Sequence, residues 1–204
     1  MKASNNIENV SMGLKASSSS DDANLWSAFK MDDEDAFKTI YFSHYDGLFQ
    51  YAMKICNDDT LCADAIQDLF SELWISRKKL GDVISIRAYL FSSVRRRVMI
   101  KLKANRQKQV IALEMVTRSP DIEFSTEMIR IREESLSLKR LVIKDVLNDL
   151  PKRQKEVIYL RFYQELSYTE IAEVMNMKYQ SVQNLFGRAL TKLRENPVLL
   201  NSFK

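Results

Sequence analysis

The chain has 204 residues, which is enough for one large or two small domains, and 46% of them are apolar, so at least one core can be buried. Its four glycines and three prolines are too few for a fold rich in turns and instead favour long helices. The net charge of +4 is unevenly distributed: residues 32–72 contain ten acidic residues and two lysines, and residues 95–108 contain seven lysines and arginines and no acidic residue. This segregation excludes a uniform nucleic-acid-binding surface, because phosphates would repel the acidic stretch.

The N-terminal residues 1–23 are polar and rich in serine, so we expect a disordered tail. They contain no apolar signal-peptide core, and no apolar run in the chain approaches the roughly 20 residues needed to cross a bilayer. We therefore expect a cytoplasmic protein that is not integral to a membrane. Cys56 and Cys62 are expected to be free thiols of a reducing compartment, since two cysteines at this spacing match neither a disulfide framework nor a zinc motif.

Three helices are predicted in the next segment. Apolar residues recur at three- and four-residue steps in residues 35–55, again in residues 62–74, and again in residues 86–98. We expect the third helix to span residues 85–104. Because three helices of this length form a small bundle, residues 24–105 are predicted to be the first domain.

The second of these helices carries an acidic face opposite its apolar stripe. Asp64, Asp68 and Glu72 lie four residues apart, and like charges at this spacing weakly destabilise a helix. Contact with a basic protein partner is one reason to tolerate them, and an ordinary solvated face is the alternative. The basic stretch at residues 95–108 suits the DNA backbone.

Residues 106–134 lose the helical period and carry more acidic than basic residues, and the pair Ser119-Pro120 breaks any helix there. A regular pattern returns at residues 135–204, where Pro151 is expected to be the first residue of a helix. The sequence therefore predicts an all-α fold of two small helical domains joined by a flexible acidic linker.

The C-terminal domain contains the pattern of a helix-turn-helix. Ser167 and Glu170 form a capping box that starts a short helix. Ala172 is small enough for a close helix crossing, and Asn176 can adopt the left-handed conformation that ends the helix. The outward side chains of the second helix are predicted to be Lys178, Tyr179, Gln180, Ser181, Gln183, Asn184 and Arg188.

This outward face has the chemistry of a DNA-reading surface. Glutamine and asparagine amides bind adenine bidentately, and arginine binds guanine in the same way. A three-helix packing unit with a polar outer face is the alternative. The coincidence of the cap, the small residue and the turn residue favours the helix-turn-helix.

Several motifs resemble those of the sigma-70 superfamily. Residues 150–157, 166–173 and 189–195 are similar to the entry, the helix-turn-helix and the ending of its promoter-reading C-terminal domain. Residues 64–74 resemble the helix that docks on the polymerase, and residues 88–95 resemble the helix that opens and reads the −10 element. With only these two domains, the chain is identified as a member of the extracytoplasmic-function (ECF) group, and its motifs are similar to those of Bacteroidetes members.

The resemblance implies an RNA polymerase sigma factor that binds core polymerase and directs promoter recognition, DNA melting and transcription initiation. Region 2 would be residues 24–105, and region 4, which reads the −35 element, would be residues 135–204. The implied partners are the clamp helices of the largest polymerase subunit, the flap of the second subunit, promoter DNA and an anti-sigma factor. The flap contact would lie near residues 161–163, and residues 80–83 are a candidate for capturing a flipped base.

The resemblance also assigns roles to individual residues. The implied polymerase-core-binding residues are Asp64, Gln67, Asp68 and Glu72. The implied −10 DNA-binding residues are Tyr89, Arg95, Arg96 and Lys101. The implied −35 DNA-binding residues are the seven outward side chains named for the second helix of the helix-turn-helix.

Other function classes lead to different expectations. A helix-turn-helix regulator with a sensing domain would bind DNA tightly without polymerase, whereas an adaptor or an anti-sigma partner would have no use for a polar reading face. An enzyme would need a catalytic constellation, but His44 is the one histidine and lies on an apolar stripe, and the glycines are isolated. We expect no catalytic residue, metal, cofactor or small-molecule substrate.

Overall fold

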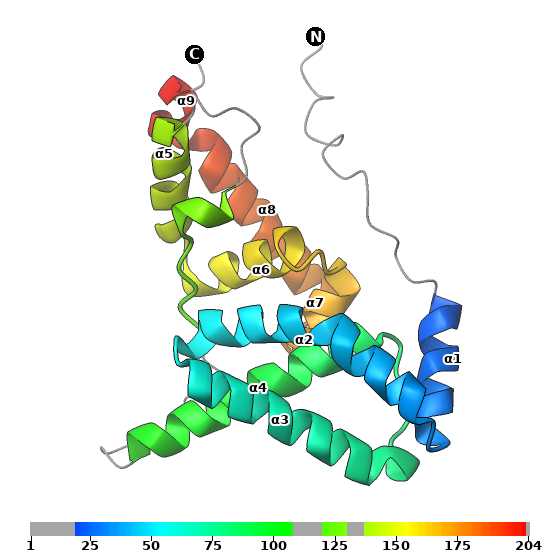
Figure 1. The fold of residues 1–204 in the computed structure, drawn as a ribbon. Coiled ribbons are helices and arrows are strands. Elements are labelled where there is room, and N and C mark those ends of the chain that lie inside the picture. The colour runs from blue at the N-terminus through cyan, green and yellow to red at the C-terminus, as the bar shows by residue number, and fades with distance from the viewer. Residues whose placement is uncertain (1–18, 108–119, 130–136, 203–204) are drawn as a thin grey trace.

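The structure, a computed structural model, describes residues 19–107, 120–129 and 137–202, which form helices and no strand (Figure 1). The predicted all-α fold is confirmed. The N-terminal half consists of α1 (Ser19–Lys30), α2 (Glu34–Cys56), α3 (Asp59–Ser76), a 3-10 turn (Arg77–Lys79) and α4 (Ile86–Gln107). After a 3-10 turn at Thr126–Met128, the C-terminal half consists of α5 (Ser137–Asn148), α6 (Lys152–Phe162), α7 (Tyr168–Val174), α8 (Tyr179–Glu195) and α9 (Pro197–Ser202).

Helices α2, α3 and α4 pack against one another around the apolar stripes predicted from the sequence. Ile40, Ile66 and Leu90, one from each helix, are fully buried. Asp33 and Asp58 cap α2 and α3 by accepting hydrogen bonds from backbone N–H groups of the first turn. The predicted three-helix core therefore forms, and the starts of α2 and α3 are each set by a local carboxylate.

Helix α1 begins at Ser19, within the segment 1–23 that was expected to be a tail. Two large side chains hold it: Trp26 and Phe29 are almost fully buried, and the Trp26 indole N–H donates to the carbonyl of Gly81 at 2.9 Å. The Asp22 carboxylate accepts from the backbone N–H of Ile86 at 3.1 Å and so caps α4. Sequence periodicity missed α1 because it is held by contacts far along the chain.

Residues 106–134 were expected to form a flexible linker, but the two parts of this segment that the structure describes, residues 106–107 and 120–129, are ordered by helix formation and by packing. Helix α4 continues to Gln107, and residues 120–129 pack against the body of the protein with Ile122 and Phe124 buried. The backbone N–H of Phe124 donates to Asn148 Oδ1 at 2.8 Å, and Asn148 Nδ2 donates to the Phe124 carbonyl at 3.1 Å. This reciprocal pair anchors residues 120–129 to the end of α5; residues 108–119 and 130–134 lie outside the described residues.

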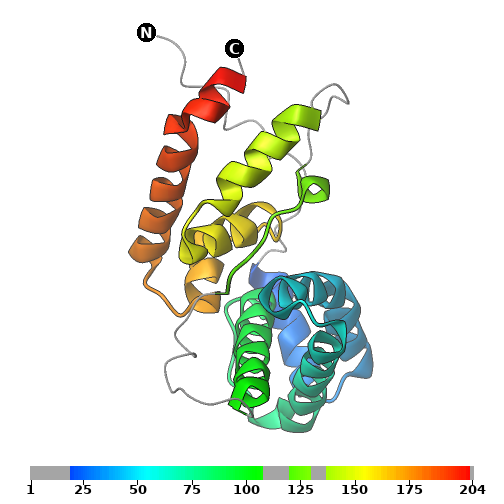
Figure 2. The ribbon, with the colours of Figure 1, turned by 90° about the vertical axis from the view of Figure 1, so that its left-hand side faces the viewer.

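The helix-turn-helix is present as α7 and α8 (Figure 2). Ser167 and Glu170 form the predicted capping box, and Asn176 has the predicted left-handed backbone with a φ of 50°. One detail was wrong: Pro151 is the N-cap of α6 and not its first residue, and its ψ of 145° keeps it extended while its carbonyl accepts the first helical hydrogen bonds.

The two halves are in contact. Helix α7 packs against α4, and in both ribbon views it lies beside the N-terminal bundle (Figures 1 and 2). No helix in the described parts of the chain is long and apolar enough to cross a membrane.

Candidate polymerase- and DNA-binding surfaces

The four residues expected to bind the polymerase core lie together on one exposed face of α3: Asp64, Gln67, Asp68 and Glu72. Two of them already have partners on α4. Lys101 Nζ lies 2.7 Å from Asp68 Oδ2, and Arg97 Nη2 donates to Glu72 Oε2 at 2.7 Å. The carboxylates of Asp68 and Glu72 remain 56% and 64% exposed. Exposed pairs of this kind stabilise a fold by only about 0–1 kcal/mol, so a basic partner can replace them.

Besides binding to a basic partner and to DNA, these ion pairs give a second reason why acidic residues gather in residues 32–72 and basic residues in residues 95–108. The repulsion expected along α3 is offset by basic side chains of α4, which crosses it. Sequence spacing along one helix could not reveal this, because the compensating charges come from residues 25 or more positions later. The acidic and basic stretches therefore complement each other within the domain.

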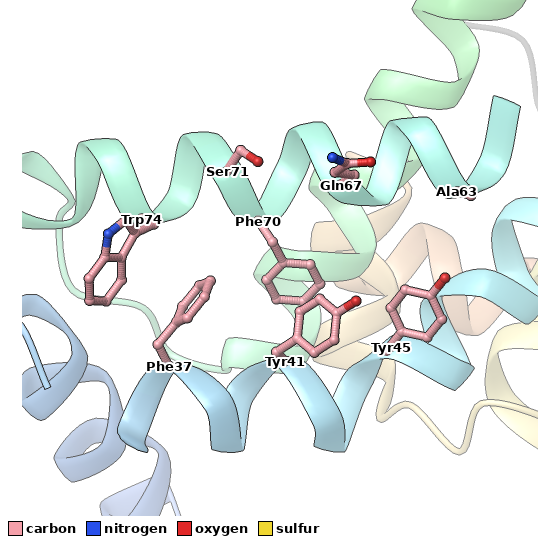
Figure 3. Close-up of a pocket in the computed structure, with 8 residues that line it drawn as sticks. All are labelled: Phe37, Tyr41, Tyr45, Ala63, Gln67, Phe70, Ser71 and Trp74. Carbon is pink, nitrogen blue, oxygen red and sulfur yellow. The ribbon is translucent and has the colours of Figure 1, made fainter. Parts of the chain in front are cut away.

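Beside this face lies an aromatic hollow of about 430 Å³ between α2 and α3 (Figure 3). Rings of α2 face rings of α3: the centroids of Tyr41 and Phe70 are 4.7 Å apart, and those of Phe37 and Trp74 are 5.0 Å apart. Gln67, one of the expected polymerase ligands, also lines the hollow. Phe70 is buried in the core, whereas Phe37, Tyr41, Tyr45 and Trp74 pack against the core and stay partly exposed at the hollow.

Exposed apolar side chains lie on the same two helices. Phe42 on α2 is 75% exposed, and Ile75 on α3 is 78% exposed. Phe42 adjoins the hollow, because its ring centroid lies 5.3 Å from that of Tyr41, which lines it. A surface that combines apolar anchors with a charged rim is typical of protein–protein interfaces.

The four residues expected to contact the −10 element are spread over different environments of α4. Tyr89 packs edge-on against Trp26, with ring centroids 5.4 Å apart, an arrangement that favours a role in core packing for this ring over stacking on a DNA base. Lys101 pairs with Asp68, and Arg96 is exposed. Arg95 is turned into the contact between the two halves of the molecule. The structure therefore does not gather these four side chains on one open surface.

Arg95 forms an ion pair with Glu156, a residue for which the sequence motifs predict no role. Glu156 on α6 is fully buried and accepts from Arg95 Nε at 2.8 Å and from the Tyr51 hydroxyl at 2.8 Å. Burial opposes the charge on Arg95, but Glu156 outweighs it and raises the arginine pKa above its ordinary value. Burial, and then the charge of Glu156, raise the pKa of Tyr51 well above its usual range.

The seven residues expected to read the −35 element lie on α8 and its N-cap. Five of them are exposed, and Ser181 and Gln183 are partly buried. Gln183 Nε2 donates to the Tyr179 hydroxyl at 3.1 Å, and Gln180 Nε2 donates to Asn184 Oδ1 at 3.4 Å. The side-chain amides of Gln180 and Gln183 are therefore oriented by hydrogen bonds to residues one helical turn away, and neither side chain is fully buried.

Other expected surface positions are also placed. Phe162, in the segment expected to meet the polymerase flap, is 58% exposed, and its ring lies 5.8 Å from that of Phe186. In the loop at residues 80–83, Asp82 pairs with Lys30 at 2.9 Å.

No cluster of histidine, cysteine and acidic residues that could hold a metal is found in the portions of the chain that the structure describes.

Comparison with known proteins identifies both halves. Residues 40–108 match the family model for sigma-70 region 2, and residues 140–193 match that for sigma-70 region 4. The chain is 25% identical over 158 residues to the ECF RNA polymerase sigma factor SigL of Mycobacterium tuberculosis, covering 77% of this chain and 86% of that protein. It is 27% identical over 171 residues to the RNA polymerase sigma-E factor of Streptomyces coelicolor, covering 79% and 86%.

Solved structures share the fold. CnrH in complex with the cytosolic domain of CnrY has a TM-score of 0.54 at 21% identity, covering 90% of this chain and 99% of that one. The sigma factor RpoE in complex with the anti-sigma factor NepR from Bartonella quintana has a TM-score of 0.52 at 18% identity, covering 81% and 96%. The chain belongs to the ECF group of the sigma-70 family, and it is an RNA polymerase sigma factor that directs promoter-specific initiation of transcription.

Proposed function

We propose that the exposed face of α3 and the adjoining aromatic hollow bind the clamp helices of the largest polymerase subunit. The observation that carries this proposal is the placement of Asp64, Gln67, Asp68 and Glu72 side by side next to an accessible apolar recess. Carboxylates suit basic helices, and the aromatic rings supply buried area at the centre of the interface. The exposed Phe162 contacts the flap of the second subunit.

The two DNA contacts are divided between α4 and α8. In this proposal Tyr89, Arg95, Arg96 and Lys101 serve the −10 element, with the basic stretch along phosphates, and residues 80–83 capture a flipped base. The outward side chains of α8 read the −35 element in the major groove, since a helix-turn-helix presents its second helix there. Residues 24–105 act as region 2 and residues 135–204 as region 4, with the linker between them near the polymerase active site.

The remaining assignments concern partners and origin. One solved neighbour is in complex with the cytosolic domain of CnrY, and the other is in complex with the anti-sigma factor NepR; we assign an anti-sigma partner to this chain as well. The chain acts in the cytoplasm with its polymerase and is of the Bacteroidetes type, as its motifs suggest. It has no catalytic residue of its own.

Run-off transcription tests the proposal. Purified core polymerase is combined with the full chain on a library of promoter fragments, and the transcripts are sequenced. We expect transcripts from a subset of promoters that share two elements at fixed spacing, and only when the chain is present. Tight and specific DNA binding by the chain alone, with no effect on core polymerase, would instead identify an ordinary helix-turn-helix regulator.

A further inference from the structure

Two thiols lie against each other at the junction of α2 and α3. The Sγ atoms of Cys56 and Cys62 are 2.9 Å apart, and both residues are free cysteines. A disulfide bond is about 2.05 Å long, so a movement of less than about 1 Å would bring the two sulfur atoms to bonding distance. The chain has only these two cysteines, so no other intramolecular disulfide can form.

A tight turn places the two cysteines together. Cys56 ends α2, and Asn57 reverses the chain with a left-handed φ of 49°, a conformation that asparagine tolerates. Asp58 then starts α3 by accepting from the backbone N–H of Leu61 at 2.9 Å. The backbone N–H of Cys62 donates to the carbonyl of Asp58 at 3.0 Å, which puts Cys62 in the first turn of α3. The contact between the thiols is therefore fixed by the backbone of both helices.

The two thiols differ in exposure. Cys56 is partly exposed, and its thiol donates to the carbonyl of Ala52 at 3.4 Å, whereas Cys62 is fully buried. Burial, and then the hydrogen bond with Cys56, raise the pKa of Cys62 above its ordinary value. The thiolate is the form that attacks an oxidant. A dissolved oxidant therefore reacts first with Cys56, and Cys62 is the thiol that completes the reaction.

We propose that Cys56 and Cys62 are a peroxide-sensitive pair that closes into an intramolecular disulfide and ties the end of α2 to the first turn of α3. The Cys56 thiolate attacks one oxygen of a peroxide, the O–O bond breaks, and a sulfenic acid forms. The departing hydroxide takes up the proton that Cys56 released. The sulfur of Cys62 then attacks the sulfenic sulfur, the S–O bond breaks, and the hydroxyl leaves as water with the Cys62 proton. The two thiols are oxidised by two electrons, and hydrogen peroxide is reduced to two molecules of water.

The disulfide staples the start of α3, the helix that carries Asp64 and Asp68. A cross-link stabilises a protein mainly by restricting its unfolded chain. Because the sulfur atoms already touch in the folded chain, closing the bond adds little strain. Oxidation therefore raises the stability of the chain and leaves α3 in its place. This chemistry does not depend on the proposed contacts with polymerase or promoter.

The test treats the purified full chain with hydrogen peroxide and follows it by intact mass spectrometry and by alkylation with iodoacetamide. We expect the chain to lose the mass of two hydrogen atoms and to resist alkylation, and dithiothreitol should restore both thiols. The midpoint of thermal unfolding, followed by circular dichroism, should rise by about 5 °C on oxidation.

Two matched variants separate the roles of the thiols, since each removes one cysteine by the same substitution. Cys62→Ala keeps the exposed thiol without its partner, so peroxide should add one oxygen atom at Cys56 as a sulfenic acid that dimedone traps. Cys56→Ala keeps only the buried thiol, which should be oxidised at least about tenfold more slowly than the thiol of Cys62→Ala. If a variant does not fold, the measurements on the unaltered chain still decide the proposal.

A peroxide-treated chain that keeps both thiols open to alkylation would overturn the proposal. Oxidation only to sulfinic acids, or only to disulfides between two chains, would overturn it as well. An unchanged or lower unfolding midpoint for the oxidised chain would show that the bond is no staple, and faster oxidation of Cys56→Ala than of Cys62→Ala would contradict the order of the two steps.

Discussion

Lys101 of α4 lies 2.7 Å from Asp68 of α3, so two side chains that we assign to different macromolecules neutralise each other in the free chain. Lys101 is 34% and Asp68 56% exposed, and the contact is therefore weak and solvent-screened. Binding of a basic polymerase helix to Asp68 would leave Lys101 free for DNA. The pair thus couples the two proposed surfaces through adjacent helices of one domain.

Reversal of charge at Asp68 tests the polymerase surface. Asp68→Arg should weaken core binding by at least about tenfold, because like charges placed across an interface cost several kcal/mol. Pull-down or titration with fluorescently labelled core polymerase measures the loss. Asp149→Arg, an equal charge change on an exposed residue of the other domain, is the control, and equal affinity of both variants would contradict the assignment of α3.

The reading face of α8 is tested by removing single side chains. Gln183→Ala or Arg188→Ala should reduce run-off transcription from the cognate promoter while core binding is retained, and each lost base contact should be worth about 1–3 kcal/mol. Lys144→Ala, on α5 and paired with Asp145, serves as the control for loss of a surface side chain. Normal output from both α8 variants would show that another surface reads the promoter.

Gly187 should lower the stability of α8. A Cβ atom there would meet nothing within 4 Å, so Gly187→Ala has no steric cost and should add about 0.5–1 kcal/mol of helix stability. The midpoint of thermal unfolding should rise. Gly81→Ala, also in open space but in a loop, should not give this helix-specific gain; a fall in the midpoint for Gly187→Ala would contradict the open environment of that position.

Acidification should destabilise the chain through His44. Burial, and then the charge of Arg87, lower the pKa of His44 from its usual 6.5. The imidazole of His44 therefore binds a proton less readily in the folded chain than in the unfolded chain. The free energy of unfolding is highest above pH 6.5, where His44 is neutral in both states, and it decreases as the pH falls toward the pKa of His44 in the folded chain. Urea unfolding at pH 7.5 and at about pH 5.5 measures the difference.

The matched variant for this pH effect is His44→Gln, which keeps a polar side chain but removes the titration. Its free energy of unfolding should change less between the two pH values than that of the unaltered chain. An identical pH dependence in both proteins would show that other groups, and not His44, cause the loss of stability in acid.

Much of the local structure could be predicted because its causes lie within a few residues. The capping box of Ser167 and Glu170, the left-handed turn at Asn176 and the apolar stripes of α2, α3 and α4 depend on neighbours three or four positions away. The fold class and the exposed face of α8 follow from the same local rules.

The features that only the tertiary structure decided depend on residues far apart in sequence. Glu156 meets Arg95 across 61 positions and Tyr51 across 105, Asn148 holds Phe124, and Trp26 secures α1 through the loop at Gly81. A buried hydrogen bond or ion pair leaves no period in the sequence, because its partners are brought together only when the helices pack. Apart from α1, the sequence therefore determined where the main helices form and which faces are polar, whereas packing decided which of those polar groups remain free to bind a partner.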